Sequence, residues 1–268
     1  MNSEQLKARF CFLKRGAVCQ IHWKRGVHAG ETGAAHTGRL EMNWKTAFRS
    51  FYYQTLDEPP PVVLAREQTA LLVVDIQACY LPATPPDDEA ELPEWERWRP
   101  FRERMHEVVV PQTQKLLAAF RAGKMDVFFA RIACLNPEGR DRSLSQARPG
   151  FNNILLPHDG ADSQIYGAVT PLEHEIVVLK TTDSALTGTN LRLLLHNMGI
   201  KNVVVCGIFT DQCVSSTVRS LADESFNVVV VHDAGATATM ELHNSELCII
   251  NNIYCQVMST DEVLEVLS

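Results

Sequence analysis

The sequence predicts an α/β fold, a three-layer α/β/α sandwich in which helices cover both faces of a central, mostly parallel sheet of about six strands. Short apolar runs alternate along the chain with segments of helical periodicity, which is the pattern of βαβ units. These runs are apolar at nearly every position, as expected of strands that are covered on both faces. The chain has 268 residues, 46% of them hydrophobic, and is long enough to bury one large core.

Each strand and helix has its own signal. The expected strands are the apolar runs at 69–75, 126–131, 175–180, 202–207, 227–233 and 254–258. The expected helices carry apolar residues at helical spacing and lie at 111–120, 191–198, 213–221 and 241–250, with a last short helix from Thr260. Proline at 111 suits a first helical turn, and glycines at 123 and 199 follow the last turns of their helices.

Two parts of different composition are expected. Residues 1–60 are predicted to be a basic N-terminal extension and linker, partly disordered, and residues 61–268 to be the folded domain. The proline-rich stretch DEPPPVV at 57–63 is typical of an extended linker. Residues 1–41 are expected to be functionally silent. Met42 precedes a more protein-like segment, NWKTAFRSFYY, and is an alternative start.

The composition excludes several functional classes. The nine Lys and Arg residues among the first 53 residues are scattered, so neither nucleic-acid nor membrane binding is expected. No run approaches the roughly 20 apolar residues of a membrane span, and the N-terminus lacks the apolar core of a secretory signal. The eight cysteines have no short regular spacing and do not predict a disulfide framework. A reducing cytoplasm is therefore the expected location.

Two long connections are expected to shape a binding pocket. Residues 81–100 are polar and proline-rich and are predicted to form a loop. Residues 132–174 are rich in turn signals, and a connection of that length in a compact fold is usually functional. The aromatic candidates for the pocket walls on these connections are Tyr80, Trp95, Trp98, Phe151 and Tyr166.

Three reactive side chains follow the predicted strands at the edge where parallel sheets bind ligands. Asp75 ends the first strand, Lys180 ends the third, and Cys213 lies a few residues after the fourth, where a helix begins. A helix N-terminus and a nearby lysine both favour a thiolate, and a carboxylate beside the thiol can take its proton. The three residues together predict a cysteine nucleophile with a general base.

Each of these residues also has a plain structural explanation. A carboxylate after a strand often caps a turn, a lysine at a strand end is usually solvated, and a single cysteine usually packs as a small hydrophobe. Cys79 and Cys134 follow the first and second strands, so they are either part of the pocket lining or bystanders. The placement of the first three at one edge of the sheet favours catalysis.

Three segments resemble the isochorismatase-like cysteine hydrolases, a superfamily that includes nicotinamidases, N-carbamoylsarcosine amidases and ureidoacrylate and biuret hydrolases. These segments are ALLVVDIQ at 70–77, VVLKTTDSALTGTNLRLLL at 177–195 and VVVCGIFTDQCVSSTVRSLADESFNVVVVHDA at 203–234. The resemblance covers roughly residues 65–268. It implies the isochorismatase-like, Rossmann-like version of the predicted fold and a homo-oligomer, either a dimer or a tetramer.

The resemblance also implies a mechanism. Its Asp-Lys-Cys triad falls on Asp75, Lys180 and Cys213, and a cis peptide bond is expected just before Phe209. The backbone N–H groups of Phe209 and Cys213 would then form the oxyanion hole. Asp75 would act as the base throughout, first for the thiol and later for the water that hydrolyses a thioester intermediate.

The sequence departs from some family members in ways that narrow the function. The segment after the second strand, RIACLNPEGRD, lacks the Asp-x-His pattern of metal-containing nicotinamidases, and the nine histidines form no ligand cluster, so neither a metal nor another cofactor is expected. Leu186 stands where an aromatic residue is common. Many true isochorismatases, which cleave a vinyl ether, work without the cysteine, so Cys213 favours C–N hydrolysis.

The favoured function is hydrolysis of a small amide, ureido or carbamoyl compound by a cysteine enzyme. The alternatives are vinyl-ether hydrolysis and a non-catalytic binding or scaffold role within the family. The expected partner is a small-molecule substrate. Candidate substrate contacts are Gln77, Tyr80, Tyr166 and Leu186.

Overall fold

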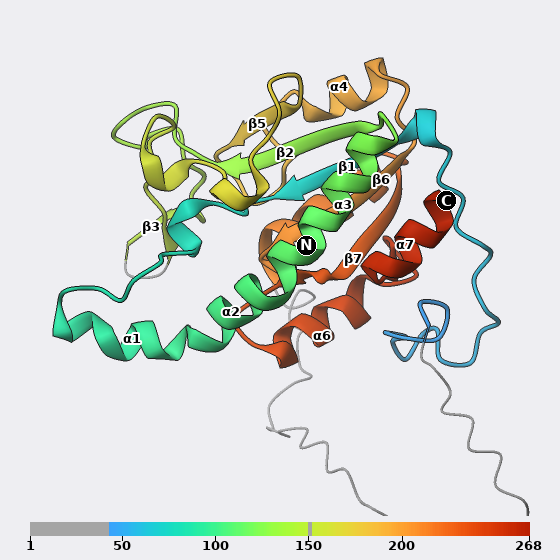
Figure 1. Ribbon diagram of the computed structural model, residues 1–268, viewed down its shortest axis with the longest axis horizontal. Coiled ribbons are helices and arrows are strands. Elements are labelled where there is room, and N and C mark those ends of the chain that lie inside the picture. The colour runs from blue at the N-terminus through green and yellow to red at the C-terminus, as the bar shows by residue number, and fades with distance from the viewer. Residues whose placement is uncertain (1–42, 150–151) are drawn as a thin grey trace, which may run out of the picture. The chain divides into compact units, whose positions relative to one another are not determined.

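The computed structural model describes residues 43–149 and 152–268, and its centre is a six-stranded sheet (Figure 1). The strands are β1 (Thr69–Val74), β2 (Asp126–Ile132), β5 (Ile176–Lys180), β6 (Asn202–Ile208), β7 (Asn227–Ala236) and β8 (Gln256–Met258). They pair in the order β5-β2-β1-β6-β7-β8, and all of these pairings are parallel. The predicted fold class is therefore confirmed. Expectations for residues 1–42 and for Phe151 lie outside the described residues.

Helices cover both faces of the sheet because successive strand residues point to opposite sides. The helices are α1 (Leu92–Arg97), α2 (Arg99–Arg104), α3 (Val110–Ala122), α4 (Leu191–Asn197), α5 (Ser215–Asp223), α6 (Met240–Ile250) and α7 (Thr260–Leu267). Leu71 and Val73 of β1 share a buried cluster with α3 and α7, whereas Leu72 and Val74 share one with α4, α5 and α6. In the part of the chain that is described, no helix is both long and apolar enough to cross a membrane.

The central strands are buried along their whole length. Every residue of β1 and of β6 is buried, and burying each Leu or Val side chain contributes about 1.5–3 kcal/mol. The edge strand β5 is less enclosed, since only two of its five residues, Val178 and Lys180, are buried. The rigid middle of the sheet therefore positions whatever follows β1 and β6.

The segment before β2 differs from the prediction. Residues 81–100 were expected to form a loop, but helix begins at Leu92 and continues through α1, α2, a π-helical turn (Met105–Val109) and α3. Pro93, Pro100 and Pro111 each lie in the first turn of one of these helices. Proline costs nothing there, because its missing N–H would have no partner within the helix. Two of the prolines that suggested a loop, Pro93 and Pro100, are therefore at helix starts.

The connection from 132 to 174 contains little regular structure. It holds one small antiparallel pair, β3 (Ala147–Arg148) with β4 (Asn152–Asn153), and two short 3-10 turns. It is tied to the sheet through backbone contacts such as Ala133 N–H to the Lys180 carbonyl at 3.1 Å. The predicted long connection is therefore present, and it lies beside the carboxyl edge of β2.

Candidate active site

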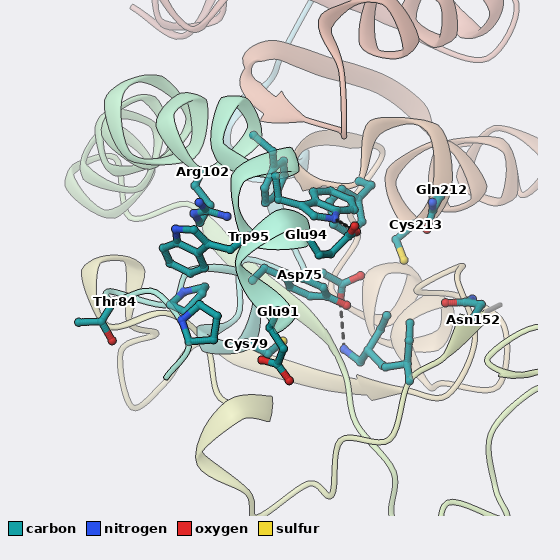
Figure 2. Close-up of a pocket in the computed structure, with 18 of the residues that line it drawn as sticks. Asp75, Cys79, Thr84, Glu91, Glu94, Trp95, Arg102, Asn152, Gln212 and Cys213 are labelled. Atoms are coloured by element: carbon teal, nitrogen blue, oxygen red, sulfur yellow. Dashed lines mark hydrogen bonds between the residues drawn. The ribbon is translucent and has the colours of Figure 1, made fainter. Parts of the chain in front are cut away.

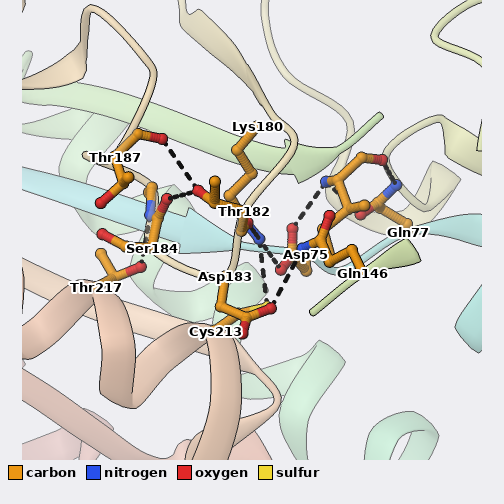
Figure 3. A network of polar contacts seen from close by, with 12 residues as sticks. Asp75, Gln77, Gln146, Lys180, Thr182, Asp183, Ser184, Thr187, Cys213 and Thr217 are labelled. Carbon is orange, nitrogen blue, oxygen red and sulfur yellow. Dashed lines mark hydrogen bonds and ion pairs between the residues drawn. The ribbon is translucent and has the colours of Figure 1, made fainter. Parts of the chain in front are cut away.

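Asp75, Lys180 and Cys213 meet at the carboxyl edge of the sheet (Figure 3). Lys180 Nζ is 2.7 Å from Asp75 Oδ2 and 3.3 Å from Cys213 Sγ. The exposed fractions of Asp75, Lys180 and Cys213 are 1%, 1% and 3%, respectively, so the cluster is almost completely buried. The structure thus brings together the three residues that the sequence selected from separate stretches of chain.

Strand order explains why a lysine fills this position. Strand β2 lies between β5, which carries Lys180, and β1, which leads to Asp75. Strands two places apart in a sheet are separated by roughly 10 Å. The long Lys180 side chain crosses β2 to reach the carboxylate, and its ammonium also donates to the Thr182 carbonyl at 3.2 Å.

The backbone around Asp75 is unusually constrained. Asp75 has a left-handed φ of 52°, its N–H donates to the Ala130 carbonyl at 2.9 Å, and its Oδ1 accepts from Ile132 N–H at 3.0 Å. On the neighbouring strand Gly207 has φ +118°, and a Cβ atom there would lie 2.0 Å from the Val74 carbonyl oxygen. Only glycine lets β6 approach β1 this closely beside the carboxylate.

Burial dominates the electrostatics of the cluster. Burial is the largest cause of the raised pKa of Asp75, although Lys180 opposes it. Burial also raises the pKa of the Cys213 thiol well above its usual value, and Asp75 raises it further. Burial alone would lower the pKa of Lys180, but Asp75 and then Cys213 outweigh it, so the pKa of the ammonium is raised. These directions favour a protonated thiol beside the Lys180–Asp75 ion pair.

This state differs from the thiolate that the sequence suggested. We expected the helix start and the lysine to lower the pKa of the thiol, but the loss of solvent outweighs the attraction of Lys180. Cys213 also lies in a π-helical turn, Thr210–Val214, rather than in the first turn of an α-helix. A thiol in this setting needs a base at the moment of attack.

The turn that carries Cys213 begins at a cis peptide bond between Ile208 and Phe209. The Phe209 carbonyl accepts hydrogen bonds from Gln212 N–H at 3.0 Å and Val214 N–H at 3.1 Å, which fixes the turn. Phe209 and Cys213 both line the same cavity. The two backbone groups expected to form the oxyanion hole thus belong to one short turn at the cavity.

The cavity above the cluster has a volume of about 870 Å³ (Figure 2). Asp75 and Cys213 lie at its inner end, and Trp95 and Arg102 lie on the far side. Its aromatic wall consists of Tyr80, Trp95, Trp98, Phe101 and Phe209. The Arg102 guanidinium carbon is 3.5 Å from the centre of the Trp95 ring. The cavity thus combines a reactive inner end with an apolar wall suited to a small organic molecule.

Of the four candidate substrate contacts, only Tyr80 lines this cavity. Gln77 is fully buried, and its amide is occupied by the backbone. Oε1 accepts from Ile132 N–H at 2.9 Å, and Nε2 donates to the carbonyls of Ile132 at 2.9 Å and Ser163 at 2.8 Å. Gln77 was expected to contact substrate but does not line the cavity, because this side chain joins the end of β2 to the following connection.

Tyr166 and Leu186 also lie away from the cavity. The Tyr166 ring packs against His106 with ring centres 6.1 Å apart, and Leu186 lines a separate groove with Arg192. Both were expected to contact substrate, but neither lines the cavity, because loop position alone does not give side-chain direction.

Two other cysteines were possible rivals to Cys213. Cys79 lines the cavity, but burial raises its pKa to about 12, so it is a thiol near neutral pH. Cys134 is buried and does not line the cavity. Within residues 43–149 and 152–268, no group of three or more His, Cys, Asp or Glu side chains is placed to hold a metal ion.

Several cavity residues were not found from the sequence. Asp183 lies three residues after β5, and its Oδ1 is 4.0 Å from Cys213 Sγ. The rule that identified Lys180 would have found Asp183, had it been extended past the strand end. Phe101 and Arg102 follow Trp95 and Trp98 at helical spacing, a signal that the loop prediction concealed.

Comparisons with known proteins agree with this architecture. The family model of the isochorismatase domain matches residues 69–262. An uncharacterized isochorismatase family protein, YecD of Escherichia coli O157:H7, is 30% identical over 76% of this chain and 98% of its own length. Ureidoacrylate amidohydrolase RutB of Acinetobacter baylyi is 27% identical over 76% of this chain and 85% of its own.

The solved structures give the same answer. An isochorismatase family protein from Burkholderia thailandensis superposes with a TM-score of 0.61 at 27% identity, over 76% of this chain and 97% of that one. The sheet order, the buried cluster at its carboxyl edge and these matches lead to one conclusion. The chain belongs to the isochorismatase-like hydrolase superfamily.

Proposed function

We propose that this protein hydrolyses the C–N bond of a small amide, ureido or carbamoyl compound through a thioester on Cys213. The observation that carries the proposal is the unbroken contact from Asp75 through Lys180 to Cys213, at distances of 2.7 and 3.3 Å. A carboxylate, an ammonium and a thiol in contact at the inner end of a cavity are suited to nucleophilic catalysis. The similarity to an enzyme named as an amidohydrolase supports the same reaction class.

In the acylation step, Asp75 takes the proton of the Cys213 thiol as the sulfur attacks the substrate carbonyl carbon. Lys180 contacts both the carboxylate and the sulfur, which keeps them close together, and it stabilises the negative charge that develops on sulfur. The carbonyl oxygen becomes an oxyanion beside the N–H groups of Phe209 and Cys213, and losing one such donor costs about 3–4 kcal/mol. Asp75 then gives its proton to the departing nitrogen, which leaves a thioester.

A protonated resting thiol fits this sequence of steps. Since burial and Asp75 both raise the pKa of Cys213, the thiol loses its proton only when the carboxylate accepts it during attack. The cost of desolvating the carboxylate makes Asp75 a stronger base than an exposed aspartate. The buried setting therefore matches the proton transfer that acylation needs.

The test is an ammonia-release screen over small primary amides, ureas and carbamoyl compounds, with three proteins in parallel. Wild type and Cys248→Ser, which alters a half-buried thiol on α6, are expected to hydrolyse the same compounds. Cys213→Ser is expected to lose activity and to form no covalent adduct in intact-protein mass spectrometry. Full activity of Cys213→Ser would contradict the proposal and favour chemistry without a cysteine nucleophile.

A further inference from the structure

A second cavity opens beside the first. It is polar, has a volume of about 500 Å³, and is lined by Asn152, Asp183, Asp211, Gln212, Ser215, Ser216 and Arg219. It shares Asn152, Asp183 and Gln212 with the cavity above Cys213. Asp183 therefore stands where an apolar substrate cavity meets a polar space that suits water.

Asp183 is held close to the reacting sulfur. Its Oδ1 is 4.0 Å from Cys213 Sγ and accepts a hydrogen bond from Gln146 Nε2 at 3.2 Å. Gln146 is fully buried, so it fixes the orientation of the carboxylate. Figure 3 shows Asp183 and Cys213 side by side, with Gln146 reaching toward the same oxygen.

The two carboxylates near Cys213 differ in their access to water. Asp75 is 1% exposed, its Oδ2 is paired with Lys180, and its Oδ1 accepts from Ile132 N–H. Asp183 is half-buried and lines both cavities. Among the described residues, no lysine or arginine forms an ion pair with Asp183.

Hydrolysis of a thioester needs a base that reaches both a water molecule and the acylated sulfur. We propose that Asp183 is the catalytic base of deacylation and that water arrives from the polar cavity. This inference rests on the proposed function and divides the proton transfers between two carboxylates. Asp75 serves acylation, and Asp183 replaces it in the step for which the family resemblance also implied Asp75.

In deacylation, the water oxygen attacks the thioester carbon and gives one proton to Asp183. The C–S bond then breaks, and the sulfur leaves with the bonding electrons as a thiolate beside Lys180. The proton on Asp183 passes to the sulfur, which restores the thiol and the carboxylate. The acid product keeps the second hydrogen of the water, so one thioester and one water give one acid and one thiol.

The experiment uses p-nitrophenyl acetate, whose leaving group needs no proton and therefore isolates deacylation. With Asp183→Asn we expect a burst of about one equivalent of p-nitrophenol, then a steady rate about 10²–10⁴-fold below wild type. Intact-protein mass spectrometry is expected to show the acetyl group accumulating on Cys213. Hydroxylamine attacks a thioester without a base, so it is expected to restore turnover of Asp183→Asn.

Two further variants keep the test decisive. Asp183→Glu retains a base and is expected to keep much more of the steady rate than Asp183→Asn. Asp223→Asn removes a carboxylate at the end of α5, outside both cavities, and is expected to behave as wild type. If Asp183 affects only the ionisation of the Cys213 thiol, Asp183→Asn will change the burst rate and leave the lifetime of the acetyl-enzyme unchanged. That result would overturn the inference.

The outcomes separate this inference from the proposed function. If wild type and Cys213→Ser turn over the ester at equal rates, the proposed function is contradicted first. If wild type and Asp183→Asn form the adduct and lose it at equal rates, the role of Asp183 alone is contradicted. Circular dichroism of each variant checks that it is folded, and the Asp183→Glu comparison still decides the role if Asp183→Asn fails to fold.

Discussion

The floor and the wall of the cavity are built in different ways. The floor, defined as Asp75, Lys180 and Cys213, comes from the end of β1, the end of the edge strand β5 and the turn after β6, and it is nearly inaccessible to solvent. The wall, defined as Tyr80, Trp95, Trp98, Phe101 and Phe209, comes mostly from α1, α2 and the preceding turn and is partly exposed. Under the proposed function, we expect the sheet to fix the chemistry and the helical segment before β2 to select the substrate.

The largest expected effect comes from breaking the floor. Lys180→Met leaves the Asp75 carboxylate buried without its cation, and losing one partner of a buried pair costs about 3–5 kcal/mol in the free energy of unfolding. The acylation burst is expected to fall about 10²–10⁴-fold. Urea denaturation and the p-nitrophenyl acetate burst measure the two effects.

A double variant sharpens this result. Lys180→Met with Asp75→Asn removes both charges, and asparagine tolerates the left-handed φ of 52° at this position. We expect it to recover much of the stability but none of the activity. Lys201→Met, at an exposed lysine, serves as the control. If Lys180→Met is acylated at the wild-type rate, the prediction that the three floor residues act together in acylation is contradicted.

The next largest effect is expected in the pH dependence of Cys213 alkylation. The pKa of Cys213 is raised by burial first and by Asp75 second, so at pH 7 the reactive thiolate is scarcer than in an ordinary thiol. The rate of labelling by iodoacetamide is expected to rise about tenfold per pH unit and to keep rising above pH 9, because the thiolate fraction grows by this factor below the pKa of the thiol. Asp75→Asn removes the second cause and is expected to speed labelling at pH 7–8 while abolishing hydrolysis.

Peptide mass spectrometry at Cys213 measures the labelling rate, with glutathione as the reference thiol. Fast labelling at pH 7 that levels off below pH 8 would show a resting thiolate and contradict the assignment of a protonated Cys213 thiol. If Asp75→Asn is labelled faster but hydrolyses substrate more slowly, Asp75 acts as a base. A group that only changed the reactivity of the thiol would shift both rates in the same direction.

The smallest expected effect comes from the wall. Trp95 lies across the cavity from Cys213 (Figure 2), and the Arg102 guanidinium packs on it at 3.5 Å. Trp95→Ala removes apolar surface that a large acyl group would cover, worth about 1–2 kcal/mol or roughly tenfold in kcat/KM. We expect p-nitrophenyl hexanoate to lose this factor and p-nitrophenyl acetate to lose almost nothing. An equal loss for both esters would indicate damage to the floor.

The sequence contains enough information to predict the floor. Strand ends in a parallel sheet converge on one edge, so Asp75, Lys180 and Cys213 could be placed together without side-chain detail. Gly207 beside them was not noticed, because its role depends on how closely β6 approaches β1. The pKa of the thiol could not be predicted either, since it depends on burial that only the packed structure reveals.

The wall could be predicted only in part. Tyr80, Trp95 and Trp98 were among the expected wall residues and line the cavity. Phe101 and the helix that carries it were not expected, because the local signals were ambiguous. Prolines 93 and 100 suggest a loop and suit a helix start equally well, and the structure uses them at helix starts. Gln77 was expected on the cavity, but its amide satisfies buried backbone groups. The cytoplasmic location and the homo-oligomeric state stay predictions.

Phe209 belongs to the wall through its ring and to the reacting turn through its backbone. The ring packs against Tyr80, Trp98 and Phe101, with ring centres 5.3, 5.9 and 5.1 Å away, respectively. Any molecule that displaces these rings will also move the amide that follows the Ile208 carbonyl. Changes that admit new substrates through this aromatic cluster will therefore alter turnover as well, so diversification is easier at Trp95 and Arg102, where the cavity can be reshaped without disturbing the turn.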